Sequence, residues 1–395
     1  MIFRKVTTVL ISVLLFSLTI NSLNIVASGS LYREPHDPII INGNEDLIST
    51  ASLEGWSGTG SETSPIVIQG LSITPETYGI YIANVELHFR IVECLIESPE
   101  MGVDRSFGIL LENCENAIIE RITVWKQVFG ICLWNSDRAF VNRTEIFECQ
   151  YGVFVNESSG VWLHSLDIIV CEVGIELNHS INTYVDQTII DHCVSSGIEC
   201  INDSGTMLRH NYIISSEIGI IIVENENWVL EESIIQSCDT GIDTFHPDGG
   251  YVIRSMIKNC SAIGIDLGMY STNISILQCW LGPDNVQNAQ DDGDFNKWYD
   301  NFEQIGNYWS DYSGNGSYFI PGEAENVDPY PLSLEDAPKW DDVVTAVGAP
   351  SDNTNQTTIQ PLDTDYFGLI SIAITSASII VIVLVAVAMF RSRLN

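Results

Sequence analysis

Four acidic side chains recur at one position of a short repeated motif. The motif is a Gly followed by Ile or Val, a variable residue and usually an aliphatic residue, and the variable position holds Glu176, Glu199, Asp243 and Asp266. If successive motifs form neighbouring strands, the two residues of each acidic pair lie about 4.8 Å apart. Carboxyl groups about 5–5.5 Å apart serve retaining glycosidases, and close like charges raise the pKa of one partner. The spacing permits glycosidic hydrolysis, although a solvated row of acids gives the same pattern.

A second candidate for chemistry is the segment DTFHPDGG, which follows one of these motifs. It brings Asp243, His246 and Asp248 together at one bend. Carboxylates beside an imidazole suit catalysis or metal binding. The alternative is an ordinary turn with polar tips, since Asp, Pro and Gly are typical turn residues.

Aromatic side chains point to binding rather than to reaction. Tyr81, Phe154 and Trp162 stand on predicted strands, where their rings are able to stack on sugars. Isolated aromatic residues are also common on strands that bind nothing. These three residues make a polysaccharide or surface glycan the candidate ligand.

The elements that must position these residues are strands of a solenoid. The Gly-Ile or Gly-Val motif occurs nine times, and from Gly108 onward each step is 22 or 23 residues. This period is too short for helical repeats, and the segments show the two-residue alternation of strands. We therefore expect an all-β parallel β-helix whose nine coils make a rod of roughly 40 Å. The glycines are Gly79, Gly108, Gly130, Gly152, Gly174, Gly197, Gly219, Gly241 and Gly264.

Two features of the coil follow from this motif. The glycine is expected to supply the positive φ of a tight bend. The residue after it and the fourth residue point inward, so the third position faces solvent. That outward column holds, in chain order, Tyr81, Leu110, Cys132, Phe154, Glu176, Glu199, Ile221, Asp243 and Asp266.

The cysteines follow the same period. Seven of the ten end an "aliphatic-x-x-Cys" motif, which predicts one buried column of free thiols rather than disulfides. A thiolate metal site is the alternative, but the sequence has no C-x-x-C pair. The seven are Cys94, Cys149, Cys171, Cys193, Cys238, Cys260 and Cys279, while Cys114, Cys132 and Cys200 lie off the column.

The period and motifs resemble the right-handed parallel β-helix repeats of the NosD-like and pectate-lyase-like superfamily, over about residues 38–333. The opening "PIIINGNEDL" and the closing "GNYWSDYSG" look like the end blocks of archaeal NosD-like surface proteins. The resemblance implies a carbohydrate-binding or sugar-hydrolysing domain. NosD itself is associated with copper-site maturation, which adds a third function, an accessory factor for metalloenzyme assembly. The sequence has neither a His-x-His pair nor a Met-rich copper motif.

A calcium site is a further expectation near the end of the repeats. Asp291, Asp292 and Asp294 offer the oxygen ligands that calcium prefers. The resembling family usually carries a calcium-type loop after "NYWSDY", and here "NGSYFIPGEAE" stands in its place. Calcium is the one cofactor that the sequence suggests.

The aromatic block "GNYWSDYSG" predicts a cap. A solenoid ends in an open stack of strands that must be covered. Tyr308, Trp309 and Tyr312 are large enough to lie over the last apolar coil, although a sugar-stacking platform is the alternative. We expect an N-terminal cap and first coil over residues 31–78, repeats over 79–285 and a C-terminal cap over 286–333.

Both ends of the chain carry membrane signals. Residues 1–28 read as a secretory signal peptide, with an uncleaved N-terminal anchor as the alternative. Residues 366–390 read as a transmembrane helix, followed by a tail at 391–395 that contains two arginines. The positive-inside rule puts this tail in the cytoplasm. The polar stretch 334–365 reads as a stalk. We therefore expect a single-pass membrane protein with an extracellular N-terminal domain.

Charge and sequons add to this expectation. The formal net charge of −36 excludes nucleic acid as a partner, because no basic patch exists to bind phosphates. Eight Asn-x-Ser/Thr sequons fit an extracellular surface. They are Asn142, Asn156, Asn178, Asn202, Asn259, Asn273, Asn315 and Asn355, of which Asn156, Asn178 and Asn202 are expected to share one bend.

These observations favour a membrane-anchored extracellular β-helix that binds glycans or serves as an envelope surface protein. The alternative is a polysaccharide hydrolase or lyase that uses the stacked carboxylates.

Overall fold

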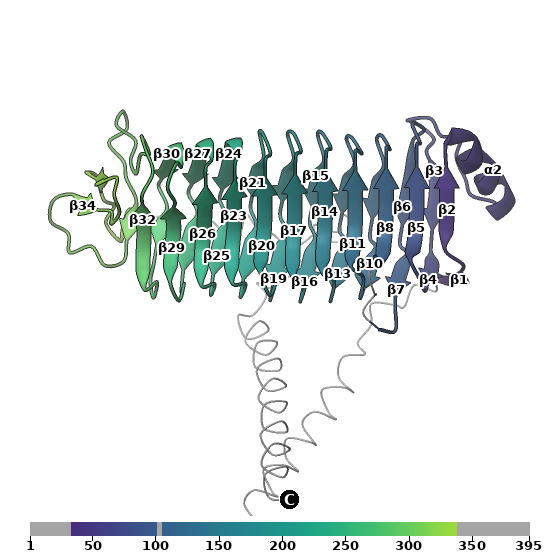
Figure 1. The fold of residues 1–395 in the computed structure, drawn as a ribbon, viewed down its shortest axis with the longest axis horizontal. Coiled ribbons are helices and arrows are strands. Elements are labelled where there is room, and N and C mark those ends of the chain that lie inside the picture. Colours follow the sequence, from purple (N-terminus) through teal and green to yellow (C-terminus); the bar gives the residue numbers. More distant parts are fainter. Residues whose placement is uncertain (1–32, 101–104, 338–395) are drawn as a thin grey trace, which may run out of the picture. The chain divides into compact units, whose positions relative to one another are not determined.

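The described part of the chain, residues 33–100 and 105–337 of the computed structural model, forms a parallel β-solenoid (Figure 1). Each coil contributes one strand to each of three parallel sheets, and successive coils stack along the rod. About ten coils at 4.8 Å each give a length of about 48 Å. The predicted right-handed parallel β-helix is confirmed. The nine glycine motifs account for nine of the 11 strands of sheet B, because β2 and β32 extend this sheet without the motif.

The three sheets are named A, B and C. Sheet A contains β1 (Glu34–His36), β4 (Leu71–Ile73), β7 (Leu95–Glu97), β10 (Thr123–Trp125), β13 (Glu145–Phe147), β16 (Asp167–Ile169), β19 (Ile189–Asp191), β22 (Tyr212–Ile214), β25 (Ile234–Gln236), β28 (Met256–Lys258), β31 (Trp280–Leu281) and β33 (Tyr308–Trp309). Sheet B contains β2 (Ile39–Asn42), β5 (Tyr78–Ala83), β8 (Phe107–Glu112), β11 (Phe129–Trp134), β14 (Tyr151–Asn156), β17 (Val173–Asn178), β20 (Ser196–Ile201), β23 (Ile218–Val223), β26 (Thr240–Phe245), β29 (Ile263–Leu267) and β32 (Gln287–Asp291). Sheet C contains β3 (Ile66–Gln69), β6 (Phe89–Val92), β9 (Ile118–Glu120), β12 (Phe140–Asn142), β15 (Trp162–His164), β18 (Tyr184–Asp186), β21 (Met207–Arg209), β24 (Glu226–Glu231), β27 (Asp248–Ile253) and β30 (Thr272–Leu277).

The glycine column is required by close packing, which corrects the expectation of positive φ. None of these nine glycines has a positive φ. A Cβ added at Gly152 would lie 2.5 Å from the carbonyl oxygen of Gly174 in the next coil and 2.7 Å from Cγ2 of Ile168 in sheet A. The same clash recurs along the column. Only glycine lets sheets A and B meet this closely.

The tight bends are made by other residues. The residue directly after each sheet B strand from β5 to β26 is a non-glycine residue in the left-handed conformation, as Asn84 is with a φ of 56°. Asn, whose short side chain hydrogen-bonds locally, tolerates this conformation better than most residues. At this bend the side chains of Asn42, Asn84, Asn113 and Asn135 form an amide ladder, with N···O distances of 2.7–2.9 Å.

The cysteines form two columns, not one. Cys149, Cys171, Cys193, Cys238 and Cys260 follow strands of sheet A, whereas Cys94 and Cys279 follow strands of sheet C. The motif "aliphatic-x-x-Cys" describes both corners, because each corner places its first inward residue three positions after a buried aliphatic residue of the preceding strand, as Cys149 follows Ile146 and Cys279 follows Ile276. All ten cysteines are free and buried, as expected for thiols that pack as small apolar groups.

A polar ladder lines the corner between sheets B and C. The backbone N–H of Ser158 donates to Oγ of Ser180, that of Ser180 to Oδ1 of Asp203 at 2.6 Å, and that of Asp203 to Oδ1 of Asn225. Asp203 is buried, and desolvation raises its pKa to about 7. Its Oδ2 finds no protein partner among the described residues.

Each end of the rod is covered. At the N-terminal end, helix α2 (Asn44–Glu54) buries Leu47 and Ala51, and Gly55 ends it in the left-handed conformation. At the other end, the short antiparallel pair β34 (Tyr318–Phe319) and β35 (Val327–Asp328) folds beside the last coil.

The aromatic block contributes to the C-terminal end in two ways. Tyr308 and Trp309 form β33, the last strand of sheet A. Trp309 is buried, donates from Nε1 to Oδ2 of Asp328 at 2.9 Å, and stacks on Tyr318 with ring centroids 4.0 Å apart. Tyr312 packs half-buried against the core and donates to the carbonyl of Gly316.

The predicted signal peptide, most of the stalk, the transmembrane helix and the tail lie outside the described residues. Within residues 33–100 and 105–337, no helix has the length and apolar character needed to cross a membrane.

Asp203→Asn tests the polar ladder. Because the folded pKa of Asp203 is raised from 3.8 to about 7, the folded state favours the protonated form, and wild-type stability falls as pH rises from about 4 to about 7. Asparagine keeps the Oδ1 acceptor and cannot ionise. We expect D203N to gain about 2–4 kcal/mol relative to wild type between pH 4 and pH 8, measured by denaturant unfolding of the full chain. The exposed Glu226→Gln is the control. A stability difference between D203N and wild type that does not change with pH contradicts this assignment.

Trp309→Ala tests the C-terminal end. Removing this buried ring should cost about 3–5 kcal/mol and remove one of the two hydrogen bonds that Oδ2 of Asp328 accepts, the other coming from the backbone N–H of Asn307. Phe302→Ala, in the same part of the chain but 91% exposed, should change the free energy of unfolding by less than about 0.5 kcal/mol. Equal effects of the two substitutions would show that the buried tryptophan does not hold the cap.

Candidate functional site

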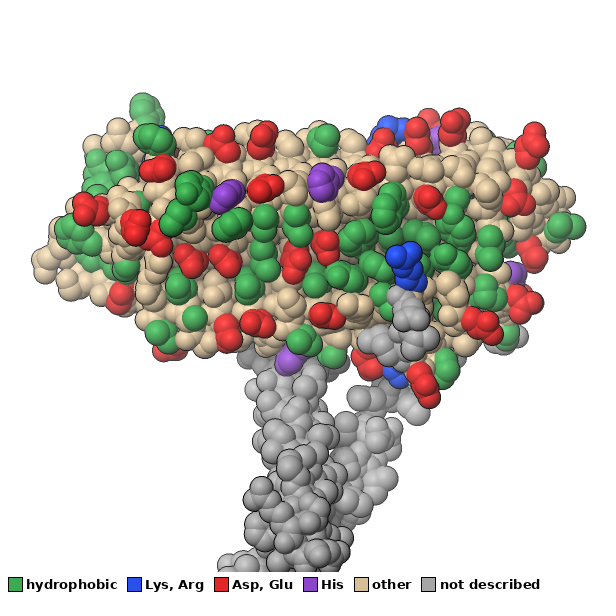
Figure 2. Space-filling view, viewed as in Figure 1, with side chains coloured by type: hydrophobic (Ala, Val, Ile, Leu, Met, Phe, Trp, Pro, Cys, Tyr) green, Lys and Arg blue, Asp and Glu red, His purple; other side chains and the backbone are tan. Residues whose placement is uncertain are grey.

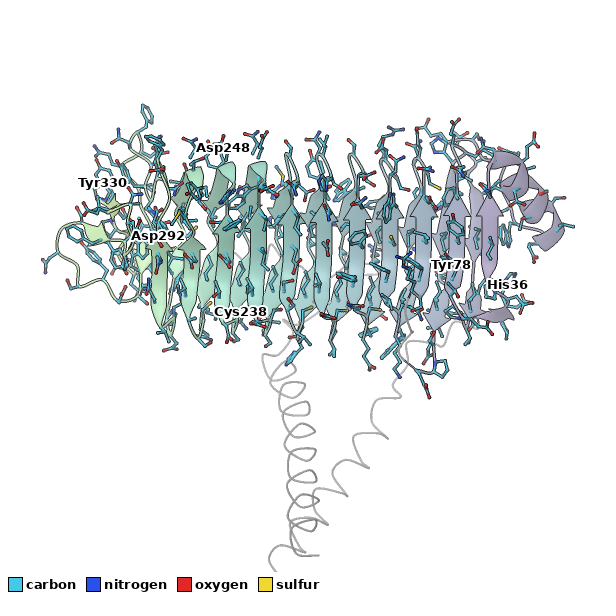
Figure 3. All side chains as sticks on the ribbon, in the orientation of Figure 1. His36, Tyr78, Cys238, Asp248, Asp292 and Tyr330 are labelled. Carbon is cyan, nitrogen blue, oxygen red and sulfur yellow. The ribbon has the colours of Figure 1, made fainter. Side chains whose placement is uncertain are left out.

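The outer face of sheet B carries most of the residues that the sequence singled out. The strand register places Tyr81, Leu110, Cys132, Phe154, Glu176, Glu199, Ile221, Asp243 and Asp266 in one column along the rod. In Figure 1 the strands of this sheet run across the front of the solenoid. In Figure 3, Tyr78 marks one end of this face and Asp292 the other.

Two members of this column do not face solvent as expected. Leu110 and Cys132 are buried, with 8% and 1% of their surfaces exposed. In the column they stand between Tyr81 and Phe154, whose larger rings flank them one coil away on either side. A side chain at the outward position is therefore exposed only where the side chains at the same position of the adjacent coils are not much larger than it is.

The N-terminal half of the face is aromatic. Tyr78, Phe107, Phe129 and Tyr151 form a ladder of stacked rings with centroids 4.9–5.4 Å apart. Because neighbours cover the ring faces, this ladder presents ring edges to solvent. Phe154 packs edge-on against Phe129 and Tyr151, at 5.4 and 5.9 Å.

Trp134 completes this aromatic half, and the sequence reasoning missed it. Its side chain is 47% exposed and tilts over Phe154 with centroids 6.5 Å apart. In the register it follows Glu112, whose carboxylate accepts a hydrogen bond of 2.6 Å from the hydroxyl of Tyr81. Trp134 ends the motif strand two residues after an outward position, so the alternation of the strand was the signal that could have found it.

The C-terminal half of the face is acidic. Glu176 pairs in register with Glu199, and Asp243 with Asp266, while Ile221 separates the two pairs. Asn178 donates to Glu176 at 3.4 Å and Ser196 donates to Glu199 at 2.5 Å. All four carboxyl side chains are half-buried. Figure 2 shows red side chains in a row across the left and middle of this face.

Burial shifts the titration of three of these acids. Desolvation, then the charge of Glu199, raises the pKa of Glu176. Desolvation raises the pKa of Asp243, and desolvation followed by the charges of Asp243 and Asp292 raises the pKa of Asp266 to about 6. A carboxyl group that is partly protonated near pH 6 is able both to donate and to accept a proton.

The segment DTFHPDGG is divided between two sheets. Asp243 belongs to β26, whereas Asp248 begins β27. Asp248 accepts hydrogen bonds from Thr272 and Asn273, and these lower its pKa. The His246 ring stacks on Phe245 and meets Tyr270 edge-on, at 4.1 and 4.8 Å.

Asp291, Asp292 and Asp294 are not grouped around one point. Asp291 is fully buried, and its two oxygens accept hydrogen bonds from Asn296, Trp298 and Asn326 at 2.8–2.9 Å, as well as from a backbone N–H. Asp292 accepts from Gln290 and from the backbone of Glu323. Among the described residues no three His, Cys, Asp or Glu side chains form a metal-binding group. Calcium stays a prediction.

Trp162 lies apart from the other two binding candidates. It belongs to β15 in sheet C, where it is 48% exposed beside Phe140 and pairs in register with Tyr184. Tyr81 and Phe154 lie on sheet B. The three aromatic candidates therefore do not form one surface.

A histidine–carboxylate chain near sheet C was also missed. His164 and His210 each place Nδ1 3.0 Å from a different oxygen of Asp186, and Nε2 of His210 lies 2.8 Å from Glu232. Arg254 donates to Glu232 at 3.0 Å. The residues come from five successive coils, so only the register brings them together.

The sequons differ in exposure. Asn156 pairs with Asn178, but Asn178 pairs with Ile201, so Asn202 lies one position further along and not in the same row. Asn156 is buried, whereas Asn142 and Asn178 are half-buried. The exposed sequon residues are Asn202, Asn259, Asn273 and Asn315, and Asn355 lies outside the described residues.

The family model described as "Periplasmic copper-binding protein (NosD)" matches residues 92–314, more than half of the chain. The chain belongs to the NosD family. The matched region contains the whole acidic row and Trp134, together with the aromatic block at its end.

Comparison with solved structures found several similar chains. A periplasmic alginate epimerase, AlgG, shares 11% identity over 75% of this chain and 80% of its own, with a TM-score of 0.47. The A-module of the mannuronan C-5 epimerase AlgE6 of Azotobacter vinelandii shares 11% identity over 74% and 91%, with a TM-score of 0.46. The Dettilon tailspike protein gp208 shares 12% identity over 64% and 50%, with a TM-score of 0.43. None of these similarities transfers an activity. No curated protein matches the sequence.

Proposed function

We propose that this NosD-family protein is a membrane-anchored extracellular β-helix that binds glycans along the outer face of sheet B. The observation that carries the proposal is the continuity of Trp134 and Phe154 with Glu176 and Glu199. An exposed indole offers a ring face for the apolar side of a sugar, and the carboxylates in the next two coils accept hydrogen bonds from its hydroxyls. The rigid stacking of the coils holds these groups in place without a ligand.

The anchoring part of the proposal rests on the sequence. The apolar run at 366–390 has the length of a bilayer span, and the polar stretch before it gives the solenoid reach from the membrane. The family description places NosD proteins in the periplasm. An N-terminal domain outside the cytoplasm agrees with that description.

Copper does not fit the described residues. Copper sites use histidine, cysteine and methionine ligands that converge on one point. Here the imidazoles of His164 and His210 both bond to the carboxylate of Asp186. The ten thiols are all buried, eight at the corners of the coils and two, Cys132 and Cys200, within sheet B strands, and burial raises the pKa of most of them. No group of three His, Cys, Asp or Glu side chains that could hold a metal ion is found in the described ranges. We therefore do not propose the role of a metalloenzyme accessory factor for this part of the chain.

Substitution of the exposed rings tests glycan binding. The full chain in detergent should bind members of a glycan array, and Trp134→Ala with Phe154→Ala should weaken that binding at least about tenfold, the effect of losing about 1.4 kcal/mol at a central aromatic contact. Trp162→Ala with Tyr184→Ala removes a comparable exposed pair from sheet C and should leave binding unchanged. If only the sheet C variant loses binding, the glycan binds sheet C, and the assignment of the binding face to sheet B is wrong.

A second candidate function is a glycan hydrolase or lyase, and the raised pKa of Asp266 beside Asp243 favours it. A general acid must be protonated at the working pH. With a folded pKa of about 6, Asp266 is protonated below that pH and loses its proton above it.

Turnover would separate the two candidates. If the acids are catalytic, oligosaccharide cleavage should fall as pH rises through about 6, and Asp266→Asn or Asp243→Asn should each reduce kcat at least about a hundredfold. Glu145→Gln, an exposed acid of sheet A, should have no effect on kcat. We expect no turnover, since glycan binding alone explains the aromatic and acidic side chains on the outer face of sheet B. Cleavage abolished by D266N or D243N but retained in E145Q makes the protein an enzyme.

A further inference from the structure

We propose that the glycan bound by sheet B is uncharged, a neutral polysaccharide rather than a polyuronide or another polyanion. This inference rests on the proposed function and specifies the class of its ligand. Three features of the face carry it: the absence of cations from its strands, the acids at its two edges, and the burial of its carboxylates.

The strands of sheet B contain no lysine or arginine. Their sequences contain acids at six positions, and five of these lie in the outward columns: Glu112, Glu176, Glu199, Asp243 and Asp266. The sixth, Asp291, is buried and bonded internally. A carboxylate or sulfate on a sugar would meet like charges in almost every coil from β17 to β29 and no cation to pair with.

The edges of the face are acidic as well. Exposed acids precede the strands at the corner with sheet A, namely Glu172, Glu217 and Asp239, and follow them at the corner with sheet C, namely Glu157 and Glu224. These corners bound the acidic half on both sides. A polyanion therefore approaches a negative surface from either edge, which slows its association as well as weakening its binding.

Cations lie elsewhere in the described residues. Arg105 and Lys126 border the aromatic half, and Lys126 lies 3.9 Å from Glu148. Arg90, Arg209 and Arg254 form ion pairs with glutamates of sheet C and its corners. Lys258 ends β28 in sheet A. Figure 2 shows one blue group on the right half of the front face, beside the grey segment.

Burial adds a second penalty against an anion. The carboxyl groups of Glu176, Asp243 and Asp266 are already partly desolvated, and this raises their pKa values. A bound anion would remove more water and place another negative charge beside them. A hydroxyl does the opposite, because it donates a hydrogen bond to the carboxylate and brings no charge.

The inference bears on the enzymatic alternative. A lyase removes the proton next to a uronate carboxyl group and so requires an anionic sugar. A neutral ligand leaves hydrolysis as the only cleavage reaction open to this face.

Calorimetry at two ionic strengths tests the charge of the ligand. The probes are cellohexaose and mannohexaose as neutral oligosaccharides and hexagalacturonate as the anion, titrated into the full chain in non-ionic detergent at about 20 mM and about 500 mM salt, below and above the range where surface charges are screened. We expect a neutral probe to bind with an affinity that changes less than about twofold with salt, since no net charge is involved. Hexagalacturonate should show no binding at low salt.

Matched variants assign the effect to this face. Neutralising the acidic row as E176Q, E199Q, D243N and D266N together should let hexagalacturonate bind at least about tenfold more tightly than the wild-type limit. The double variant E145Q/D167N neutralises an acidic pair that is also in register, but on sheet A, and should not. If the fourfold variant does not fold, E176Q/E199Q and the salt dependence of the wild type decide the question.

The outcomes separate this inference from the proposed function. Wild-type binding of hexagalacturonate at low salt that weakens at high salt overturns the neutral ligand but leaves glycan binding intact. Binding of none of the three probes, with no hit on the glycan array, removes both. Gain of hexagalacturonate binding in E145Q/D167N places the repulsion on sheet A and contradicts the inference.

Discussion

The close approach of successive coils at the glycine column is the constraint on which the rest of the structure depends. A methyl group at any of these positions would lie 2.4–2.6 Å from the carbonyl oxygen of the next coil, well inside contact distance. Since no other residue fits, the chain must return to this point once per coil. In the sheet B strands from β8 to β29, each residue then stands over its equivalent 22 or 23 positions earlier, and the corners carry columns of like character.

This constraint turns a sequence period into a surface. Side chains that are distant in sequence become neighbours in a column, and the outer face of sheet B divides into an aromatic half and an acidic half at the boundary between β14 and β17. Packing holds the face rigid, so its acids remain half-buried beside one another despite their repulsion. Ordering costs little on binding to such a surface, because the groups are already in place. A preorganised face with rings and hydrogen-bond acceptors suits an extended sugar chain.

The sequence predicts the coil well and its corners poorly. The inward residues such as Ile80 and Ile82, the outward column and the register of Glu176 with Glu199 follow from the two-residue alternation and the repeat length alone. The reason for the glycines does not, because a clash with the next coil is invisible in one strand's sequence. The sequence predicted one cysteine column instead of two, because the strands of sheet A and of sheet C that precede these cysteines have similar sequences. The sequence analysis also missed Trp134 and the bridge that Asp186 makes between His164 and His210. Both depend on contacts between side chains of neighbouring coils, which the sequence of a single coil does not reveal.

The most direct test of the central claim is chemical labelling of carboxyl groups in the presence of ligand. Carbodiimide and an amine modify solvent-accessible acids, and peptide mass spectrometry of the full chain reports each site. With the bound neutral oligosaccharide, Glu176 and Glu199 should be labelled several-fold more slowly, whereas Glu145 and Asp167 on sheet A should be labelled at the same rate as in the free protein. Protection of Glu145 and Asp167 without protection of Glu176 and Glu199 would contradict the assignment of the binding face to sheet B.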